Sequence, residues 1–285
     1  MAYKLHLFLK AIARWTSRVT RLGIGGQYWA NLMAQFTDIE WDLSNLRTLE
    51  LLGQQAGYVG LIDDDTNDLS SVAERITLFR AAKNTTTLVA NQEITPYIAA
   101  LNFLPWYTLT NVVLQERLSS PFELWRLLVM GCPNLVSASL SWLGRAHFVP
   151  PPTTVLVDTL KHLKLEIRPD GWNELPHFFS LFVFQSLTHL EVFVIEADMP
   201  VDDAEIYQPV GDIASFPSLT VFRIDSGFPV PCVIDLLGSM PQVGTFIMNF
   251  DRLQQALRRD GPQPVEHRAS LGGMLNSETW PRGPA

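Results

Sequence analysis

The chain has 285 residues, of which 47% are hydrophobic and 18% are charged, which is enough apolar material for a substantial folded core. Its formal net charge of -8 gives no global basic field, which disfavours generic binding to nucleic acid or to an anionic membrane. Cys132 and Cys232 form no C-x-x-C pair, so the sequence indicates neither a disulfide framework nor a zinc site and favours a reduced cytoplasmic or nuclear location.

The first 18 residues contain an apolar run that Lys10 and Arg14 interrupt. This run is too short for the core of a signal peptide and far too short to span a bilayer, and the rest of the sequence offers no candidate span. We therefore expect no membrane partner. Val19, Leu22 and Ile24 then form a degenerate first copy of a repeated pattern, which predicts an amino-terminal cap.

One nine-residue frame recurs eight times after this cap. Its first, fourth, seventh and ninth positions are apolar, as in CPNLVSASL at 132–140. Of the 32 such positions, Thr85 is the one that is not apolar, whereas composition alone would fill about half of them. The copies, mostly about 25 residues apart as in leucine-rich repeats, lie at 43–51, 82–90, 106–114, 132–140, 157–165, 184–192, 216–224 and 240–248.

The third position of every frame is polar, as expected for a turn in which a side chain hydrogen-bonds before the chain enters a strand. The third-position residues are Asn45, Asn84, Thr108, Asn134, Thr159, Ser186, Ser218 and Gln242.

Helical signals separate the frames. Residues 120–129 begin with Ser120 as N-cap, Pro121 at N1 and Glu123 at N3, and similar stretches lie at 68–82, 172–184 and 230–240. Alternating strands and helices favour parallel strands joined by right-handed crossovers. We predict an α/β fold: a leucine-rich-repeat solenoid, or horseshoe, with a concave parallel β-sheet and convex helices. The repeat domain covers 1–258, and the Gly- and Pro-rich residues 259–285 are predicted to be a flexible tail.

No motif indicates chemistry. Residues 63–74 partly imitate a calcium loop, but Asp68 stands where the sharp turn needs glycine, so we interpret them as a solvated acidic loop. Residues 23–26 are Gly-rich without a complete dinucleotide fingerprint, which favours a turn after the first strand. Cys132 occupies a core position and is predicted to be a small buried hydrophobe. We predict no catalytic residue, no cofactor, no metal ligand and no enzyme; an enzyme with scattered, unrecognised residues is the less favoured alternative.

The repeats resemble the leucine-rich-repeat portion of fungal-type F-box/LRR proteins. The resemblance rests on the Cys-Pro-Asn-Leu entry at 132–135 and on Arg14-Trp15 followed by the cap, and it covers roughly residues 11–249 as a pattern. It implies a protein that reads substrates for a ubiquitin ligase. No Leu-Pro-x-Glu-Leu-like F-box segment precedes the first repeat, so a Skp-type adaptor is expected as a partner only if an F-box exists outside this chain. The asparagine ladder that follows each L-x-L in regular repeats is also missing.

Strand residues that alternate with the buried ones must face the concave surface. In the amino-terminal copies these are uncharged or sparsely charged residues, such as Thr48, Glu50, Thr87, Val89, Asn111 and Val113, followed by Ser137 and Ser139. The carboxyl-terminal copies instead place a mixed-charge row on this face. The candidate partner-binding residues are His162, Lys164, Glu166, His189, Glu191, Phe193, Arg223 and Asp225.

Two interpretations of this row remain open. The charges could merely solvate the exposed face, or they could bind a protein partner, which is how solenoids of this kind commonly use a concave surface. We favour a non-catalytic recognition module, the substrate-reading part of an F-box-like ubiquitin-ligase receptor. A free-standing LRR scaffold without a ligase role is the alternative.

Overall fold

The computed structural model describes residues 7, 10–26, 39–53, 78–91, 104–115, 131–142, 155–167, 175, 178–179, 182–194, 216–225, 230–238, 240 and 242–249. The acidic segment 63–74, the predicted helix start at 120–129 and the predicted tail at 259–285 lie outside these residues.

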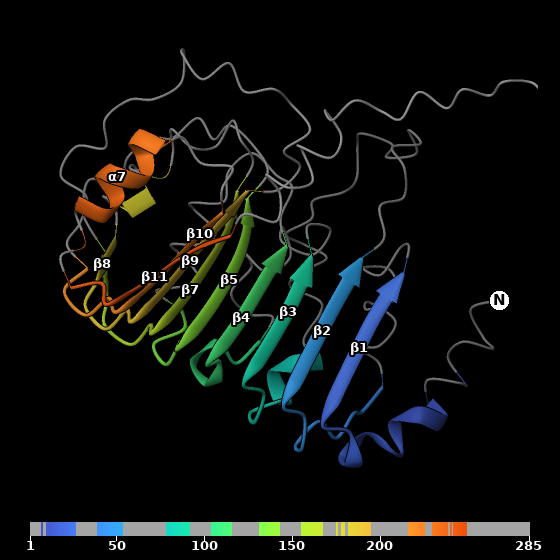
Figure 1. The fold of residues 1–285 in the computed structure, drawn as a ribbon. Coiled ribbons are helices and arrows are strands. Elements are labelled where there is room, and N and C mark those ends of the chain that lie inside the picture. The colour runs from blue at the N-terminus through green and yellow to red at the C-terminus, as the bar shows by residue number, and fades with distance from the viewer. Residues whose placement is uncertain are drawn as a thin grey trace, which may run out of the picture.

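Nine strands form one parallel sheet in the order β1-β2-β3-β4-β5-β7-β9-β10-β11 (Figure 1). They are β1 (Arg21–Gly26), β2 (Thr48–Gly53), β3 (Thr87–Asn91), β4 (Asn111–Gln115), β5 (Ser137–Trp142), β7 (His162–Ile167), β9 (His189–Val194), β10 (Val221–Asp225) and β11 (Thr245–Asn249). Each strand after β1 begins at the sixth position of its predicted frame, and register pairs equivalent positions of neighbouring copies, as in Leu49 with Leu88. The predicted parallel-strand solenoid is confirmed.

Two hydrogen-bond patterns recur at the turns that enter the strands. In six of the eight frames the N–H of the fourth residue donates to the carbonyl of the first, as Leu135 does to Cys132 at 3.1 Å. The fifth residue's carbonyl then accepts two N–H groups from the next copy: Thr110 O accepts from Val136 N at 2.9 Å and from Ser137 N at 3.0 Å. Because the backbone of one copy satisfies that of the next, a copy is stable only beside its neighbours.

The polar third position adds side-chain bonds between copies, as predicted. Asn134 Nδ2 donates to Tyr107 O at 2.6 Å, and Asn84 Nδ2 donates to Ser44 O at 2.5 Å. Asn45, Thr108 and Ser218 make comparable bonds to the preceding copy. Side-chain bonds at the entry turn therefore link several neighbouring copies, from an amide in three frames and from a hydroxyl in two.

The core is one continuous cluster. All four core positions are buried in each of the first seven frames, Thr85 included, whose hydroxyl donates to Leu46 O at 3.4 Å. The last frame differs. Met240 is buried, whereas Val243 and Met248 are half-buried and Phe246 is exposed. Within the described residues, the core thus thins out at β11.

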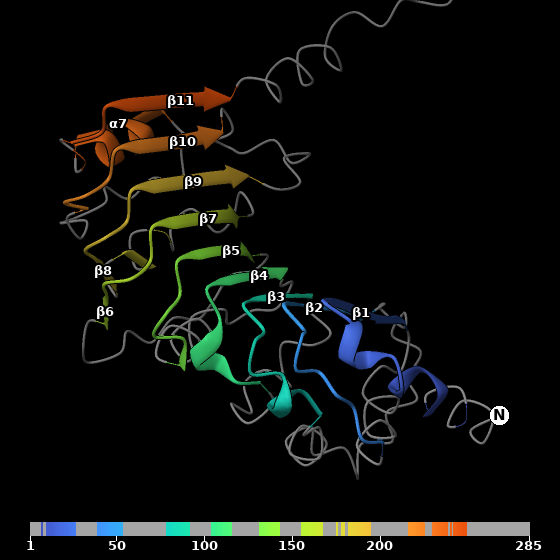
Figure 2. The same ribbon diagram turned by 90° about the horizontal axis from the view of Figure 1, so that it is seen from below.

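The row of strands bends, and α7 (Val230–Gly238) and the short strand β8 (Phe182–Phe184) lie on the outer side of the bend (Figure 2). Val233 and Leu236 of α7 belong to the same core cluster as the buried strand positions. The buried face of the sheet is therefore its outer, convex face, and the alternate residues line the concave face.

Helices are fewer in the described residues than predicted. The helix expected at 230–240 is present as α7, and three 3-10 turns are η1 (Thr16–Arg18), η2 (Leu78–Ala81) and η3 (Trp106–Thr108). Residues 10–13 are also helical, as are the isolated described residues 7, 131, 175 and 178–179. The helix predicted over 172–184 is wrong at its end, since Phe182–Phe184 is strand β8, which pairs with β6 (Val155–Val157) in a second sheet. Alternation decides this segment: Phe182 and Phe184 are buried on one side of β8, with Val183 between them. No described helix is long and apolar enough to cross a membrane.

Candidate functional site

Three rows of side chains cross the concave face, because the parallel register aligns every second residue of neighbouring strands. One row passes from Ser137 to His162 and His189. The second passes from Ser139 to Lys164, Glu191 and Arg223. The third joins Ser141, Glu166 and Phe193, which are partners in the register of β5, β7 and β9.

The concave face has two zones of different chemistry. From β3 to β5 it carries small uncharged side chains, all half-buried: Thr87, Val89, Asn91, Asn111, Val113, Ser137, Ser139 and Ser141. From β7 to β10 it carries charged, imidazole and aromatic side chains. We call these the neutral zone and the charged zone. Beyond the neutral zone, at the amino-terminal end, Arg21 of β1 and Glu50 of β2 form an ion pair of 2.6 Å.

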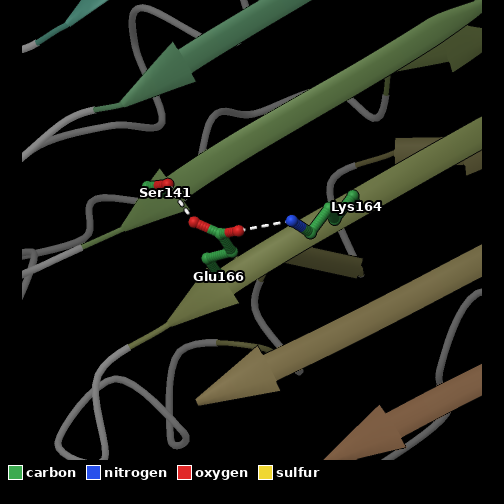
Figure 3. A network of polar contacts seen from close by, with 3 residues as sticks. All are labelled: Ser141, Lys164 and Glu166. Carbon is green, nitrogen blue, oxygen red and sulfur yellow. Dashed lines mark hydrogen bonds and ion pairs between the residues drawn. The ribbon is translucent and has the colours of Figure 1, made fainter. Parts of the chain in front are cut away.

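Glu166 links the two zones (Figure 3). Its Oε2 accepts a hydrogen bond from Ser141 Oγ at 2.5 Å, and its Oε1 pairs with Lys164 Nζ at 2.5 Å. Glu166 and Lys164 lie two residues apart on β7 and therefore project from the same face. Both oxygens of this carboxylate have a partner, so the arrangement fixes Glu166 between β5 and β7.

Phe193 lies between two cations from the strands on either side. Lys164 Nζ of β7 and Arg223 Cζ of β10 are each 5.2 Å from the centre of its ring. Such cation–π contacts contribute about 0.5–1 kcal/mol at exposed sites. The Arg223 Nε is buried and has no hydrogen-bond partner among the described residues. Phe193 thus contacts both cations, and one donor of Arg223 has no acceptor in this part of the chain.

His162 and His189 are register partners whose ring centres lie 4.5 Å apart at an angle of 34°. His189 Nδ1 is 2.9 Å from Thr188 Oγ1. Burial lowers the pKa of His162 below its ordinary value, and the neighbouring His189 and Lys161 lower it further, while Glu191 opposes the shift. Burial and the adjacent imidazole therefore both favour the uncharged form of His162.

Seven of the eight predicted site residues have described side chains, and all seven lie on the concave face of β7, β9 and β10 as expected. The eighth, Asp225, belongs to β10, but its side chain lies outside the described residues. Sequence reasoning missed Ser141, which stands one alternation beyond Ser139. Extending the period-two rule to the end of β5 would have found it.

The part of the chain that the structure describes contains no group of three or more His, Cys, Asp or Glu side chains that could hold a metal ion. Cys132 is buried as predicted, and desolvation raises the pKa of its thiol to about 12, which keeps it protonated and unreactive.

Comparison with known proteins identifies no family or relative: no family model, no curated protein and no solved structure matches this chain.

Proposed function

We propose that this chain is a non-catalytic protein-recognition module that binds a protein partner on its concave face. We further propose that it is a leucine-rich-repeat horseshoe acting as the substrate-reading part of an F-box-like ubiquitin-ligase receptor. The observation that carries the recognition role is the convergence of Lys164, Phe193 and Arg223 from three neighbouring strands. Aromatic and arginine side chains held in place are the usual anchors of protein interfaces.

The rigidity of the scaffold supports the same role. The candidate residues project from paired strands and not from loops, so little conformational entropy is lost when a partner binds them. The neutral zone beside them offers small side chains that a partner can approach closely. The neutral zone would let a partner approach the sheet closely, and the charged zone would select which partner binds.

The test is capture of interacting proteins by the full chain, followed by mass spectrometry. A variant with Lys164→Ala, Glu191→Ala and Arg223→Ala should lose the captured partner while its circular dichroism stays unchanged. The matched control is Arg14→Ala, Lys83→Ala and Asp158→Ala, which removes the same number of charges from exposed positions outside the rows. Equal capture by the two variants would refute binding through the charged zone.

The ligase role has its own readout. Recovery of Skp and cullin subunits with the chain would support it, because those subunits define such a receptor. Consistent capture of a partner without them would favour the second candidate, a free-standing LRR scaffold. The ligase receptor and the free-standing scaffold would both bind a partner on the concave face, so the triple variant tests partner binding in either case.

A further inference from the structure

Arg223 differs from two other cations of the concave face, Lys164 and Arg21. Lys164 pairs with Glu166, and Arg21 pairs with Glu50. Among the described residues, no carboxylate lies within ion-pair distance of Arg223, although Glu191 is its register partner on β9. Its guanidinium lies 5.2 Å from the centre of the Phe193 ring, and its buried Nε has no acceptor among the described residues. Arg223 is thus a cation that contacts an aromatic ring and has no ion-pair partner in the described part of the chain.

Apolar residues neighbour Arg223 on β9, β10 and β11, together with the acidic residues Glu191 on β9 and Asp225 on β10. Phe193 packs against the guanidinium, and Val221 lies two residues earlier on the same face of β10. Ile247 of β11, the register partner of Arg223 on its other side, is 42% exposed. An arginine stacked on an aromatic ring keeps its edge donors in one plane, which suits the two oxygens of a carboxylate.

We infer that Arg223, Phe193 and Ile247 form a subsite for the carboxylate of an Asp or Glu in the bound partner, next to an apolar side chain that contacts Phe193 or Ile247. This inference rests on the proposed function, whose partner it describes more closely. The positive charge of Arg223, which has no carboxylate partner among the described residues, favours an anionic group as its ligand. Glu191 and Glu166 favour a singly charged carboxylate over a doubly charged phosphate, because each added charge is repelled by both.

The experiment uses a phage-displayed library of random twelve-residue peptides, selected in parallel on the full wild-type chain, on Arg223→Gln and on Arg223→Lys. Lys83→Gln, which removes an exposed cation at the entry to β3, is the matched control. Circular dichroism and thermal unfolding establish that each variant is folded. Affinities of selected peptides, and of copies with the acidic residue changed to its amide, are then measured by fluorescence polarisation.

We expect the wild-type chain and Lys83→Gln to enrich peptides that carry Asp or Glu beside an apolar residue. Arg223→Gln should lose the acidic preference. Changing the acidic residue to its amide should weaken binding to the wild-type chain about tenfold or more, because a charge-assisted hydrogen bond is lost. The same change should have no effect on Arg223→Gln, and Arg223→Lys should recover part of the preference through charge alone.

Two outcomes would overturn the subsite. One is an unchanged acidic preference in Arg223→Gln. The other is an equal loss of the acidic preference in Asp225→Asn, which would indicate that Arg223 acts through its neighbour on β10. The variant Val113→Glu, which places a charge in the neutral zone, distinguishes failure of the subsite from failure of the proposed function. Peptides that respond to Val113→Glu but not to Arg223→Gln would leave concave-face recognition standing, whereas peptides insensitive to both would refute both proposals.

Discussion

Phe222 and Phe246 offer a matched test of where the core ends. They are the same residue type at the seventh position of neighbouring frames, they are register partners on β10 and β11, and their ring centres lie 5.8 Å apart. Phe222 is fully buried, whereas Phe246 is 41% exposed. Each is to be changed to alanine, and the free energy of unfolding is then measured by urea denaturation followed by circular dichroism.

Removing a buried phenylalanine costs about 3–5 kcal/mol, because the transfer free energy of the ring is lost and a cavity remains. For Phe222→Ala we expect a loss near the middle of this range. For Phe246→Ala we expect about 1–2 kcal/mol, because much of its ring is already in water and a truncated side chain at the edge leaves no enclosed cavity. At about 2–4 °C of Tm per kcal/mol for a large domain, the two variants should be readily separated.

The control is Leu190→Ala, a fully buried seventh-position residue one strand further in, which should cost about 2–5 kcal/mol. Equal losses for the two phenylalanine variants would refute the reasoning, because the difference in burial would then have no energetic counterpart.

Three further predictions concern the turns, the histidine pair and the buried thiol. Asn134→Ala should lower the free energy of unfolding by about 0.5–1.5 kcal/mol in urea denaturation, because its bond to Tyr107 O is lost, while Pro133→Ala at the same exposed turn should lose less; equal losses would contradict a role for the amide. The pKa of the His162 imidazole should lie below its ordinary value in an NMR pH series and should rise in His189→Asn, and an unchanged pKa in that variant would contradict an effect of the neighbouring ring. Since the pKa of His162 is lowered on folding, its contribution to stability is complete above pH about 6.5 and declines as the pH falls from there through the folded-state pKa. Cys132 should resist iodoacetamide at pH 8 in the native protein and react after denaturation, as mass spectrometry of its peptide would show; rapid native labelling would contradict its burial.

Several parts of the fold were predictable from sequence because they depend on local rules. The repeated apolar positions identified the buried residues of seven frames, and each predicted frame has its strand at the same place. Alternation then placed His162, Lys164 and Glu191 on the exposed face. The helix predicted over 172–184 failed at its end because a run of apolar residues suits a buried strand as well as a helix, and pairing with β6 decided between them.

Contacts between copies could not be predicted in the same way. His162 and His189 are 27 positions apart in the sequence, and nothing local indicates that their rings stack. Phe193 likewise has no sequence signal that places it between Lys164 and Arg223. These neighbours depend on the register between strands, which is established only when the backbone of one copy hydrogen-bonds to the next.

The sequence by itself thus determined the period, the buried positions, the turn that enters each strand and the face on which the candidate residues lie, because these follow from the alternation of side chains along one strand. The tertiary structure alone decided which charges pair, which ring orients Arg223 and where the core becomes exposed at β11. The physical reason is that pairing and burial depend on neighbouring strands, and the packing of those strands fixes distances that no single repeat encodes.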